Sequence, residues 1–502
     1  MKLLTLLLIS TLASFAWSRT AEEWKSRVIY QMVTDRFATS DGSTPECTDL
    51  LNYCGGTFKG IERNLDYIQD MGFNAIWISP TIENSDGGYH GYWYKNFYGI
   101  NKHFGTEQEF KDLVQTCHDR DIWVMVDVVP NHVTPVPNNT DFSEIVPFND
   151  EKYYHWPILD CQWVFDNQPN NHTALEFCWL WSLPDLDHEN EEVSKILLEW
   201  IRDFVQTYQI DGLRADAVRH VPKWFWAEFT KAAGVFVIGE VFKAETEFVA
   251  EYQGPLDSLL NFPLQDRLHK AFHEGESMEC FAEYFVDAAS TWPDITVIGN
   301  FVSNHDIPRF LWKNDDVPAF KAAYGFAFSS VGIPSVYYGD EQAFNGGIDP
   351  ENRETLWGKM DTKSEMYQFF KTLITFRQKS GFNNFEQVER LSDEAFYSFS
   401  RGLYFFAFTN SKEVQNRFIT SHPYSENMRL CNAFDQKDCV QVKNGEFAVN
   451  LVNKEFKIFF PVSGDDEDKT GVSFERLFQS IWSNEGITDM SKMSSFVPLG
   501  KN

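Results

Sequence analysis

Hydrophobic positions recur along residues 28–338 in two alternating patterns. Short, nearly continuous apolar runs predict strands that are buried on both faces, and they alternate with stretches that carry an apolar residue every three or four positions, as on one face of a helix. The predicted strands span residues 28–33, 74–79, 122–129, 212–217, 235–239, 258–262, 297–302 and 335–338. Eight such strand–helix units predict an α/β fold, the closed (β/α)8 TIM barrel, in which catalysis takes place at the carboxyl ends of the strands.

The same spacing predicts the helices between the strands. Residues 60–71 place apolar side chains on one face, and Gly72 can end that helix. Thr106 and Glu109 have the spacing of a capping box, which predicts the start of the next helix. A long amphipathic helix is predicted over residues 193–208, directly before the strand at 212–217.

The alternation is interrupted after the third strand and ends before the C-terminus. A stretch rich in proline, asparagine and aromatic residues predicts an inserted subdomain at 132–184, between barrel segments 19–131 and 185–391. Alternating strands and polar turns predict a C-terminal antiparallel β domain at 392–462. Residues 463–502 are predicted to form an acidic linker and an amphipathic helical tail.

The N-terminus and the net charge limit where the protein acts and what it binds. Residues 1–18 have the pattern of a secretory signal peptide, with cleavage expected between Ala16 and Arg19, so we expect a secreted protein, extracellular or in the lumen of a digestive compartment. No later apolar run is long enough to span a bilayer. A net charge of −30 repels phosphate backbones and anionic lipids, so we expect no nucleic acid or membrane partner. A neutral polysaccharide is compatible with this charge, and we expect a monomer.

Eight cysteines in a secreted chain predict disulfides, and short sequence separations favour local pairs, although other pairings stay open. The favoured pairs are Cys47 with Cys54, Cys161 with Cys178, and Cys431 with Cys439. Cys117 lies on the apolar face of its predicted helix, so we expect a buried free thiol there and at Cys280. Residues 138–140 and 171–173 are N-glycosylation sequences, which is consistent with secretion.

Three acidic residues follow predicted strands. Asp216 lies two positions after Arg214, and because side chains alternate along a strand, both point the same way and the guanidinium keeps the carboxylate ionised. Glu240 directly follows the apolar run 235–239, which raises its pKa toward the value that a general acid needs. Asp306 follows the strand at 297–302. Each residue alone is better explained as a cap or an ion-pair partner, but three at equivalent barrel positions predict a catalytic site.

Four segments around these residues resemble the four signature regions of the alpha-amylases of glycoside hydrolase family 13, in the same order. They are residues 127–132 (Asp-Val-Val-Pro-Asn-His), 212–216 (Gly-Leu-Arg-Ala-Asp), 239–241 (Gly-Glu-Val) and 304–306 (Asn-His-Asp). The resemblance runs from Trp24 through the barrel and, more weakly, across the C-terminal domain. It is strongest to secreted eukaryotic alpha-amylases, which share segments like 89–93 and 182–187.

The resemblance implies endo-acting hydrolysis of α-1,4-glucosidic bonds in starch, glycogen and maltooligosaccharides, with retention. It implies Asp216 as the nucleophile, Glu240 as the general acid and then base, and Asp306 as the carboxylate that stabilises the transition state, which agrees with the two carboxyl groups that acetal cleavage requires. The residues implied to contact substrate are His90, Tyr92, Trp93, His132, Arg214, Arg219, His305, Asp349 and Arg353. Core packing remains the alternative for Tyr92 and Trp93.

The resemblance also implies a structural Ca2+ between the barrel and the inserted subdomain. The matching positions are Asn131, Glu176, Asp185 and His220, the last through its backbone carbonyl, and calcium prefers such oxygen ligands. The sequence departs from close relatives at Arg219, where they carry lysine, and in a shorter loop between Cys178 and Ser182. Two other functions stay open: an alpha-glucosidase or transglycosylase on the same fold, and a non-catalytic carbohydrate-binding member, against which the intact acidic trio argues.

Overall fold

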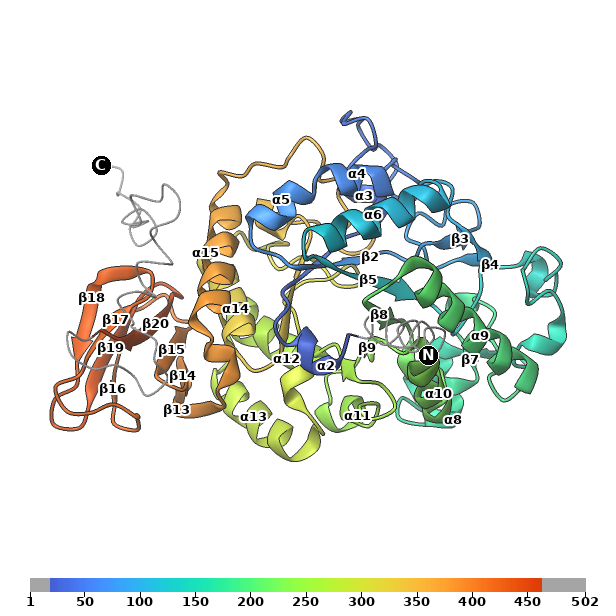
Figure 1. The fold of residues 1–502 in the computed structure, drawn as a ribbon. Coiled ribbons are helices and arrows are strands. Elements are labelled where there is room, and N and C mark those ends of the chain that lie inside the picture. The colour runs from blue at the N-terminus through green and yellow to red at the C-terminus, as the bar shows by residue number, and fades with distance from the viewer. Residues whose placement is uncertain (1–18, 463–502) are drawn as a thin grey trace, which may run out of the picture. The chain divides into compact units, whose positions relative to one another are not determined.

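The computed structural model describes residues 19–462, and both the predicted signal peptide and the predicted helical tail lie outside them. The chain divides into two compact units (Figure 1). Within the described residues, the first unit comprises 19–263, 290–312 and 332–368, and the second comprises 264–289, 313–331 and 369–462.

The first unit contains the eight predicted strands in one parallel sheet. They are β1 Ile29–Gln31, β2 Ala75–Ile78, β5 Trp123–Val128, β8 Gly212–Ala215, β9 Phe236–Gly239, β10 Ser258–Leu259, β11 Gly299–Asn300 and β12 Ile333–Tyr337. The strand order is β10-β9-β8-β5-β2-β1-β12-β11. The two end strands are joined by a parallel bridge between Leu260 and Gly299, where Asn261 N donates to Gly299 O at 2.8 Å. The sheet is therefore a TIM barrel, as the sequence predicted.

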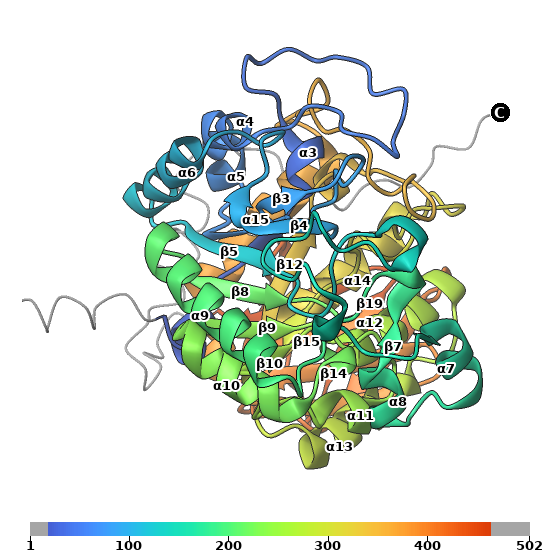
Figure 2. The ribbon, with the colours of Figure 1, turned by 90° about the vertical axis from the view of Figure 1, so that its right-hand side faces the viewer.

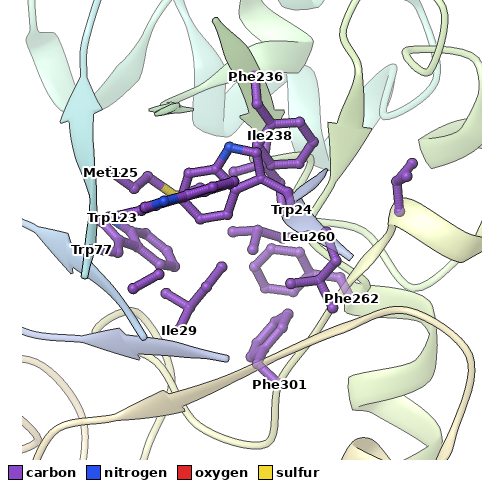
Figure 3. Close-up of a cluster of buried hydrophobic side chains, with 13 residues drawn as sticks. Trp24, Ile29, Trp77, Trp123, Met125, Phe236, Ile238, Leu260, Phe262 and Phe301 are labelled. Atoms are coloured by element: carbon purple, nitrogen blue, oxygen red, sulfur yellow. The ribbon is translucent and has the colours of Figure 1, made fainter. Parts of the chain in front are cut away.

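Alternate residues of these strands meet in one hydrophobic cluster (Figure 3). Trp24, which precedes β1, closes this cluster: its ring stacks on Phe236 with centroids 5.3 Å apart and meets the Trp123 ring edge-on at 5.2 Å. Its Nε1 donates to Asp211 O at 3.3 Å, so the buried indole has a hydrogen-bond partner. Burying each such side chain contributes about 1.5–3 kcal/mol, and the cluster fixes the strands that carry the site.

Helices connect these strands, and one prediction about them needs correction. The helical segments of the first unit outside the insertion are α2 Ala21–Trp24, α3 Thr34–Phe37, α4 Phe58–Arg63, α5 Leu65–Asp70, α6 Glu107–Asp119, α9 Glu191–Tyr208, η4 Val218–His220, α10 Lys223–Ala233, α11 Thr246–Ala250, η6 Ile295–Val297 and η7 Asp340–Gln342. The predicted helix 60–71 is two helices, because the backbone of Asn64 leaves helical geometry at φ −109°, ψ 16°. The capping box at Thr106 and Glu109 is confirmed.

The predicted insertion lies between β5 and α9, and a small hairpin precedes it. The hairpin is β3 Ile82–Asn84 with β4 Tyr94–Ile100, and the insertion contains η1 Pro137–Asn139, η2 Glu151–Tyr153, β6 Leu159–Asp160, α7 Cys161–Asn167, α8 His172–Glu176, β7 Cys178–Trp179 and η3 Leu180–Ser182. An antiparallel bridge between His132 and Asp185 joins its two ends. The ends of the insertion are thus held together beside the barrel strand β5.

The second unit contains the predicted antiparallel β domain. Its strands are β13 Gln387–Asp393, β14 Phe396–Arg401, β15 Tyr404–Thr409, β16 Gln415–Ile419, β17 Arg429–Asn432, β18 Asp435–Gln441, β19 Phe447–Leu451 and β20 Phe456–Pro461. They form a six-stranded sheet, β13-β14-β15-β20-β17-β18, and the pair β16-β19. The first strand begins at Gln387, earlier than the predicted start of the domain at residue 392. The sequence did not indicate this start because β13 is partly exposed and lacks an alternating pattern. Helical segments that lie in this unit or at its edges are α12 Phe262–Leu268, η5 His269–Glu274, α13 Glu279–Thr291, α14 Val317–Ser329, α15 Glu365–Ser380 and η8 Phe382–Asn384.

All three predicted disulfides are formed, and they are local. They join Cys47 to Cys54, Cys161 to Cys178, and Cys431 to Cys439. Cys117 is a buried free thiol as expected, whereas the free thiol of Cys280 is only partly buried. Within residues 19–462, no helix has the length and apolar character needed to cross a membrane.

Candidate active site

Asp216 follows β8 and contacts a buried guanidinium. Arg214 Nη1 donates to Asp216 Oδ1 at 2.6 Å and to Asp127 Oδ1 at 3.0 Å. Asp127 lies directly opposite Arg214 in the β5–β8 register, and both side chains are only 1% exposed. The prediction that Arg214 and Asp216 point the same way is confirmed. Asp127 therefore holds the guanidinium in place, and the guanidinium presents a fixed positive charge to Asp216.

Glu240 follows the neighbouring strand β9. Ala215 pairs with Gly239, so Asp216 and Glu240 leave adjacent parallel strands at the same level. Burial raises the pKa of Glu240 from its ordinary value of 4.5 to about 7; Arg214 opposes this rise and Asp216 adds to it. A carboxyl group that stays protonated close to neutral pH can act as a general acid.

Local backbone geometry sets the positions of these two carboxyl groups. Ala217 has a left-handed φ of 52°, and its N–H donates to Glu240 Oε2 at 3.0 Å. A Cβ at Gly239 would lie 2.5 Å from Leu256 Cδ1 and 2.9 Å from Val218 Cγ2, so a larger residue directly before Glu240 would displace these side chains. The turn after β8 and the glycine at the end of β9 thus bring the two loops together.

Asp306 lies in the loop after β11 and faces three basic side chains. Its Oδ2 lies 3.3 Å from His305 Nε2 and 3.9 Å from Arg214 Nη2, and its Oδ1 lies 3.7 Å from Arg353 Nη2. Burial favours a higher pKa for Asp306, but the adjacent His305 ring together with the guanidinium charges of Arg214 and Arg353 outweighs it, and the pKa is lowered. Asp306 is therefore held as a carboxylate near Arg214, the residue that also contacts Asp216.

Three rings form a stack beside these carboxylates. Tyr92 stacks on His305, with centroids 5.4 Å apart and planes 5° apart, and His90 stacks on Tyr92 at 5.6 Å. Tyr92 Oη lies 2.8 Å from Asp127 Oδ2 and 2.7 Å from His305 Nε2. Burial lowers the pKa of His90 and of His305 to about 3, so both imidazoles are neutral. Neutral imidazoles next to a partly exposed phenol ring suit an uncharged ligand with hydroxyl groups.

The remaining predicted contact residues support this group. Arg353 donates from Nε and Nη2 to His305 O at 3.1 and 3.0 Å, and its Nη1 lies 3.1 Å from Asp349 Oδ1. His132 Nε2 lies 3.2 Å from Tyr92 O. Trp93 meets the His90 ring edge-on at 4.9 Å and is partly buried. These four residues lie in one connected group around the ring stack.

Arg219 lies close to Glu240 and contacts the inserted subdomain. Its guanidinium lies over the Phe165 ring, 4.5 Å from the centroid, and Nη1 donates to Phe242 O at 3.2 Å. Burial lowers the pKa of Arg219, while the charge of Glu240 opposes this. The side chain therefore connects the insertion, through Phe165, with the loop that carries Glu240.

The four predicted calcium ligands fall into two neighbouring pairs. Asn131 and Asp185 are fully buried and lie next to each other, since Leu186 N donates to Asn131 O at 2.9 Å. Asn131 Oδ1 and Asp185 Oδ1 both lack a hydrogen-bond partner among the described residues. His220 Nδ1 donates to Leu175 O at 2.8 Å, beside Glu176. Unpartnered buried oxygens are costly, and these oxygens fit a hard cation such as calcium.

A histidine that the sequence analysis did not identify lies next to this group. His155 Nδ1 lies 2.7 Å from Asp185 Oδ2, and its Nε2 lies 3.1 Å from Glu189 Oε2 and 3.3 Å from Asp187 Oδ1. Burial alone would lower the pKa of His155, but the bonds to Asp185 and Glu189 outweigh it and raise the pKa to about 10. His155 is therefore a cation that holds the second oxygen of Asp185.

Sequence reasoning also missed Asp127 as a site residue. Asp127 Oδ2 accepts from Trp77 Nε1 at 3.2 Å as well as from Tyr92, and it also accepts from Arg214. One buried carboxylate therefore connects these three side chains. Its position at the start of the segment 127–132 was the available signal. A buried strand reads as uniformly apolar, and an acidic residue inside it indicates a polar partner.

Comparison with known proteins identifies the family of this arrangement. The model of the alpha amylase catalytic domain matches residues 31–386. Alpha-amylase 1 and Alpha-amylase 2 of Schizosaccharomyces pombe are each 42% identical, over 72% and 74% of this chain and 60% and 66% of those proteins. The matches thus span less than two thirds of the length of these two relatives. The structure of an alpha-amylase from Malbranchea cinnamomea superposes with a TM-score of 0.83 at 33% identity, covering 88% of this chain and 97% of that one.

Proposed function

Because this chain belongs to the alpha-amylase family, we propose that it hydrolyses internal α-1,4-glucosidic bonds of starch, glycogen and maltooligosaccharides with retention of configuration. One observation carries the proposal: an Arg214-bound Asp216 and a Glu240 of raised pKa end adjacent parallel strands. Adjacent strands lie about 4.8 Å apart. Side chains that leave adjacent strands at the same level can bring their carboxyl groups to the roughly 5–5.5 Å that retaining glycosidases require.

In the first half-reaction, Asp216 attacks the anomeric carbon while Glu240 protonates the departing glycosidic oxygen. The hydrogen bond from Arg214 Nη1 holds the Asp216 carboxylate in position for attack, and burial raises the pKa of Glu240, which favours its protonated form. The products are a glycosyl ester on Asp216, a shortened glucan with a free hydroxyl, and an ionised Glu240. This division of roles follows from the different surroundings of the two carboxyl groups.

In the second half-reaction, Glu240 removes a proton from water, which attacks the anomeric carbon and releases Asp216. Asp306 stabilises the positive charge that develops on the sugar in both steps, since its lowered pKa keeps it ionised. The cleaved sugar binds against the partly exposed side chain of Tyr92, and His90, His132 and His305 line this subsite. Further contacts come from Trp93, Arg219, Asp349 and Arg353.

We assign a structural calcium site to Asn131, Glu176, Asp185 and the carbonyl of His220. The unpartnered oxygens of Asn131 and Asp185 support this assignment. When bound, the ion supplies positive charge that ties the insertion to the barrel, and it takes no part in bond cleavage. Secretion fits the three disulfides of the described residues, since such bonds persist in oxidising compartments.

Digestion of amylose tests the proposal. We expect a rapid fall in polymer length, with maltooligosaccharides that carry the α configuration at their new reducing ends, measured by chromatography and NMR. Glucose as the sole early product would instead identify an alpha-glucosidase, and longer or cyclic products would identify a transglycosylase. No turnover, together with intact maltoheptaose binding, would identify a non-catalytic carbohydrate-binding protein.

A further inference from the structure

The helices α9 and α10 lie side by side on the outside of the barrel (Figure 1 and Figure 2). Residues of both helices line a surface groove. Its volume is about 510 Å³. It is lined by His188, Glu189, Glu191, Ser194, Lys195, Leu198, Glu199, Arg202, Trp224, Lys231 and Ala232. None of these residues is part of the catalytic group. The α9 lining follows helical spacing from Glu191 to Arg202, so one face of the helix, roughly 16 Å long, forms one wall.

Trp224 gives this groove its main apolar surface. The indole is 50% exposed, although the next two residues of α10, Phe225 and Trp226, are fully buried. Removing apolar surface from water is favourable, so a ligand that covers the exposed half of the indole would gain binding free energy. Leu198 and Ala232 extend the apolar surface beside it.

The polar lining is rich in both hydrogen-bond donors and acceptors. Lys195 and Lys231 provide ammonium donors, and Glu191 and Glu199 provide carboxylate acceptors. Among residues 19–462, these four side chains are all exposed, and none has an ion-pair or hydrogen-bond partner. Their hydrogen-bonding capacity is therefore free for a ligand.

The charges of the groove identify the kind of ligand. Glu189 is paired with His155 and Arg202 with Asp203, which leaves two acidic residues, Glu191 and Glu199, and two basic ones, Lys195 and Lys231, so the groove is balanced on a chain with a net charge of −30. A balanced set of donors and acceptors around an exposed indole suits a neutral polymer of hydroxyl-bearing rings. It does not suit a nucleic acid, which needs an excess of positive charge.

We propose that this groove is a second glucan-binding site, separate from the catalytic centre, with Trp224 as the platform on which a glucose ring stacks. The site goes beyond the proposed hydrolysis, because it retains the enzyme on its polymer without contacting the bond that is cleaved. Its effect is largest on insoluble starch, where one chain can occupy the groove while another occupies the active site.

Adsorption to starch granules tests this site. We expect Trp224→Ala to weaken adsorption at least about fivefold, the effect of losing a contact worth more than about 1 kcal/mol, while kcat/KM on maltotetraose stays unchanged. Trp224→Phe should recover part of the adsorption, because it keeps an aromatic face. The matched control is Phe418→Ala, which removes another exposed ring (60% exposed) from β16 of the second unit and should change neither quantity.

Titration with maltoheptaose separates the two sites. On a Glu240→Gln background, which prevents hydrolysis, we expect two binding events, of which Trp224→Ala removes one. The proposal is overturned if Trp224→Ala adsorbs like the parent, or if its kcat/KM on maltotetraose falls in parallel. A change in sedimentation of the Trp224→Ala protein would instead identify the groove as a contact between copies. If the parent adsorbs through Trp224 but hydrolyses no glucan, the proposed activity fails and this site stands.

Discussion

Replacing Glu240 by glutamine should have opposite effects on catalysis and on stability. The glutamine keeps the size of the side chain and an oxygen that can accept from Ala217 N, 3.0 Å away in the parent. It cannot give a proton to the departing oxygen. We expect kcat on maltooligosaccharides to fall by about 100- to 10,000-fold, the usual contribution of general acid–base catalysis, while maltoheptaose still binds.

The stability effect follows from the pKa of Glu240. The folded-state pKa is raised from 4.5 to about 7, chiefly by burial. The neutral carboxyl group is therefore favoured in the folded protein, and the resulting stability is fully present below pH 4.5 and is lost as the pH rises through 7. The full shift corresponds to about 3 kcal/mol, and partial exposure of the side chain reduces it to about 2 kcal/mol. Glutamine does not ionise, so Glu240→Gln should be more stable than the parent by this amount at pH 8 and not at pH 4.

Denaturant unfolding at pH 4, 6 and 8 measures this difference, and kcat is measured on the same preparations. Glu228→Gln is the control, since Glu228 is exposed on α10 and its replacement should alter neither quantity. Turnover by Glu240→Gln within tenfold of the parent would refute the assignment of the general acid. A stability difference that is the same at all three pH values would refute the burial argument.

Further predictions concern the nucleophile, the calcium site and the C-terminal segment. Asp216→Asn should abolish turnover and leave no trapped glycosyl-enzyme in mass spectrometry; a sugar trapped on another residue would move the nucleophile. Excess chelator should lower the melting temperature, because an ion at 1,000 times its Kd adds about 4 kcal/mol to the folded state; an unchanged value in the parent and in Asp185→Asn would contradict the site. His155→Ala should weaken calcium binding by roughly 10- to 100-fold in titration calorimetry, since His155 orients Asp185, and an unaltered Kd would make its role purely structural. Truncation after Val462 should keep activity on soluble maltooligosaccharides and increase binding of a hydrophobic dye; loss of granule adsorption alone would make the tail a recognition element.

The sequence determined the barrel because the relevant signals are local. Strands buried on both faces read as apolar runs, so all eight could be located without knowing their neighbours. The carboxyl ends of parallel strands gather at one end of the barrel, so Asp216 and Glu240 could be placed together from order alone. Short separations likewise favoured the correct disulfides, because the ends of a short loop are seldom far apart.

Other features depend on distances that only packing sets. Asp127 and Arg214 are 87 positions apart, and His155 and Asp185 are 30 apart, yet each pair is within hydrogen-bond distance. No periodicity along the chain predicts which buried polar groups face each other across strands or across an insertion. The spacing of apolar residues predicts which face of a helix is buried, but it predicts neither the break at Asn64 nor the groove beside Trp224. The sequence by itself therefore determined the barrel and the order of its acidic residues, whereas the tertiary structure decided which charges are paired, and thereby how strongly each carboxyl group holds its proton.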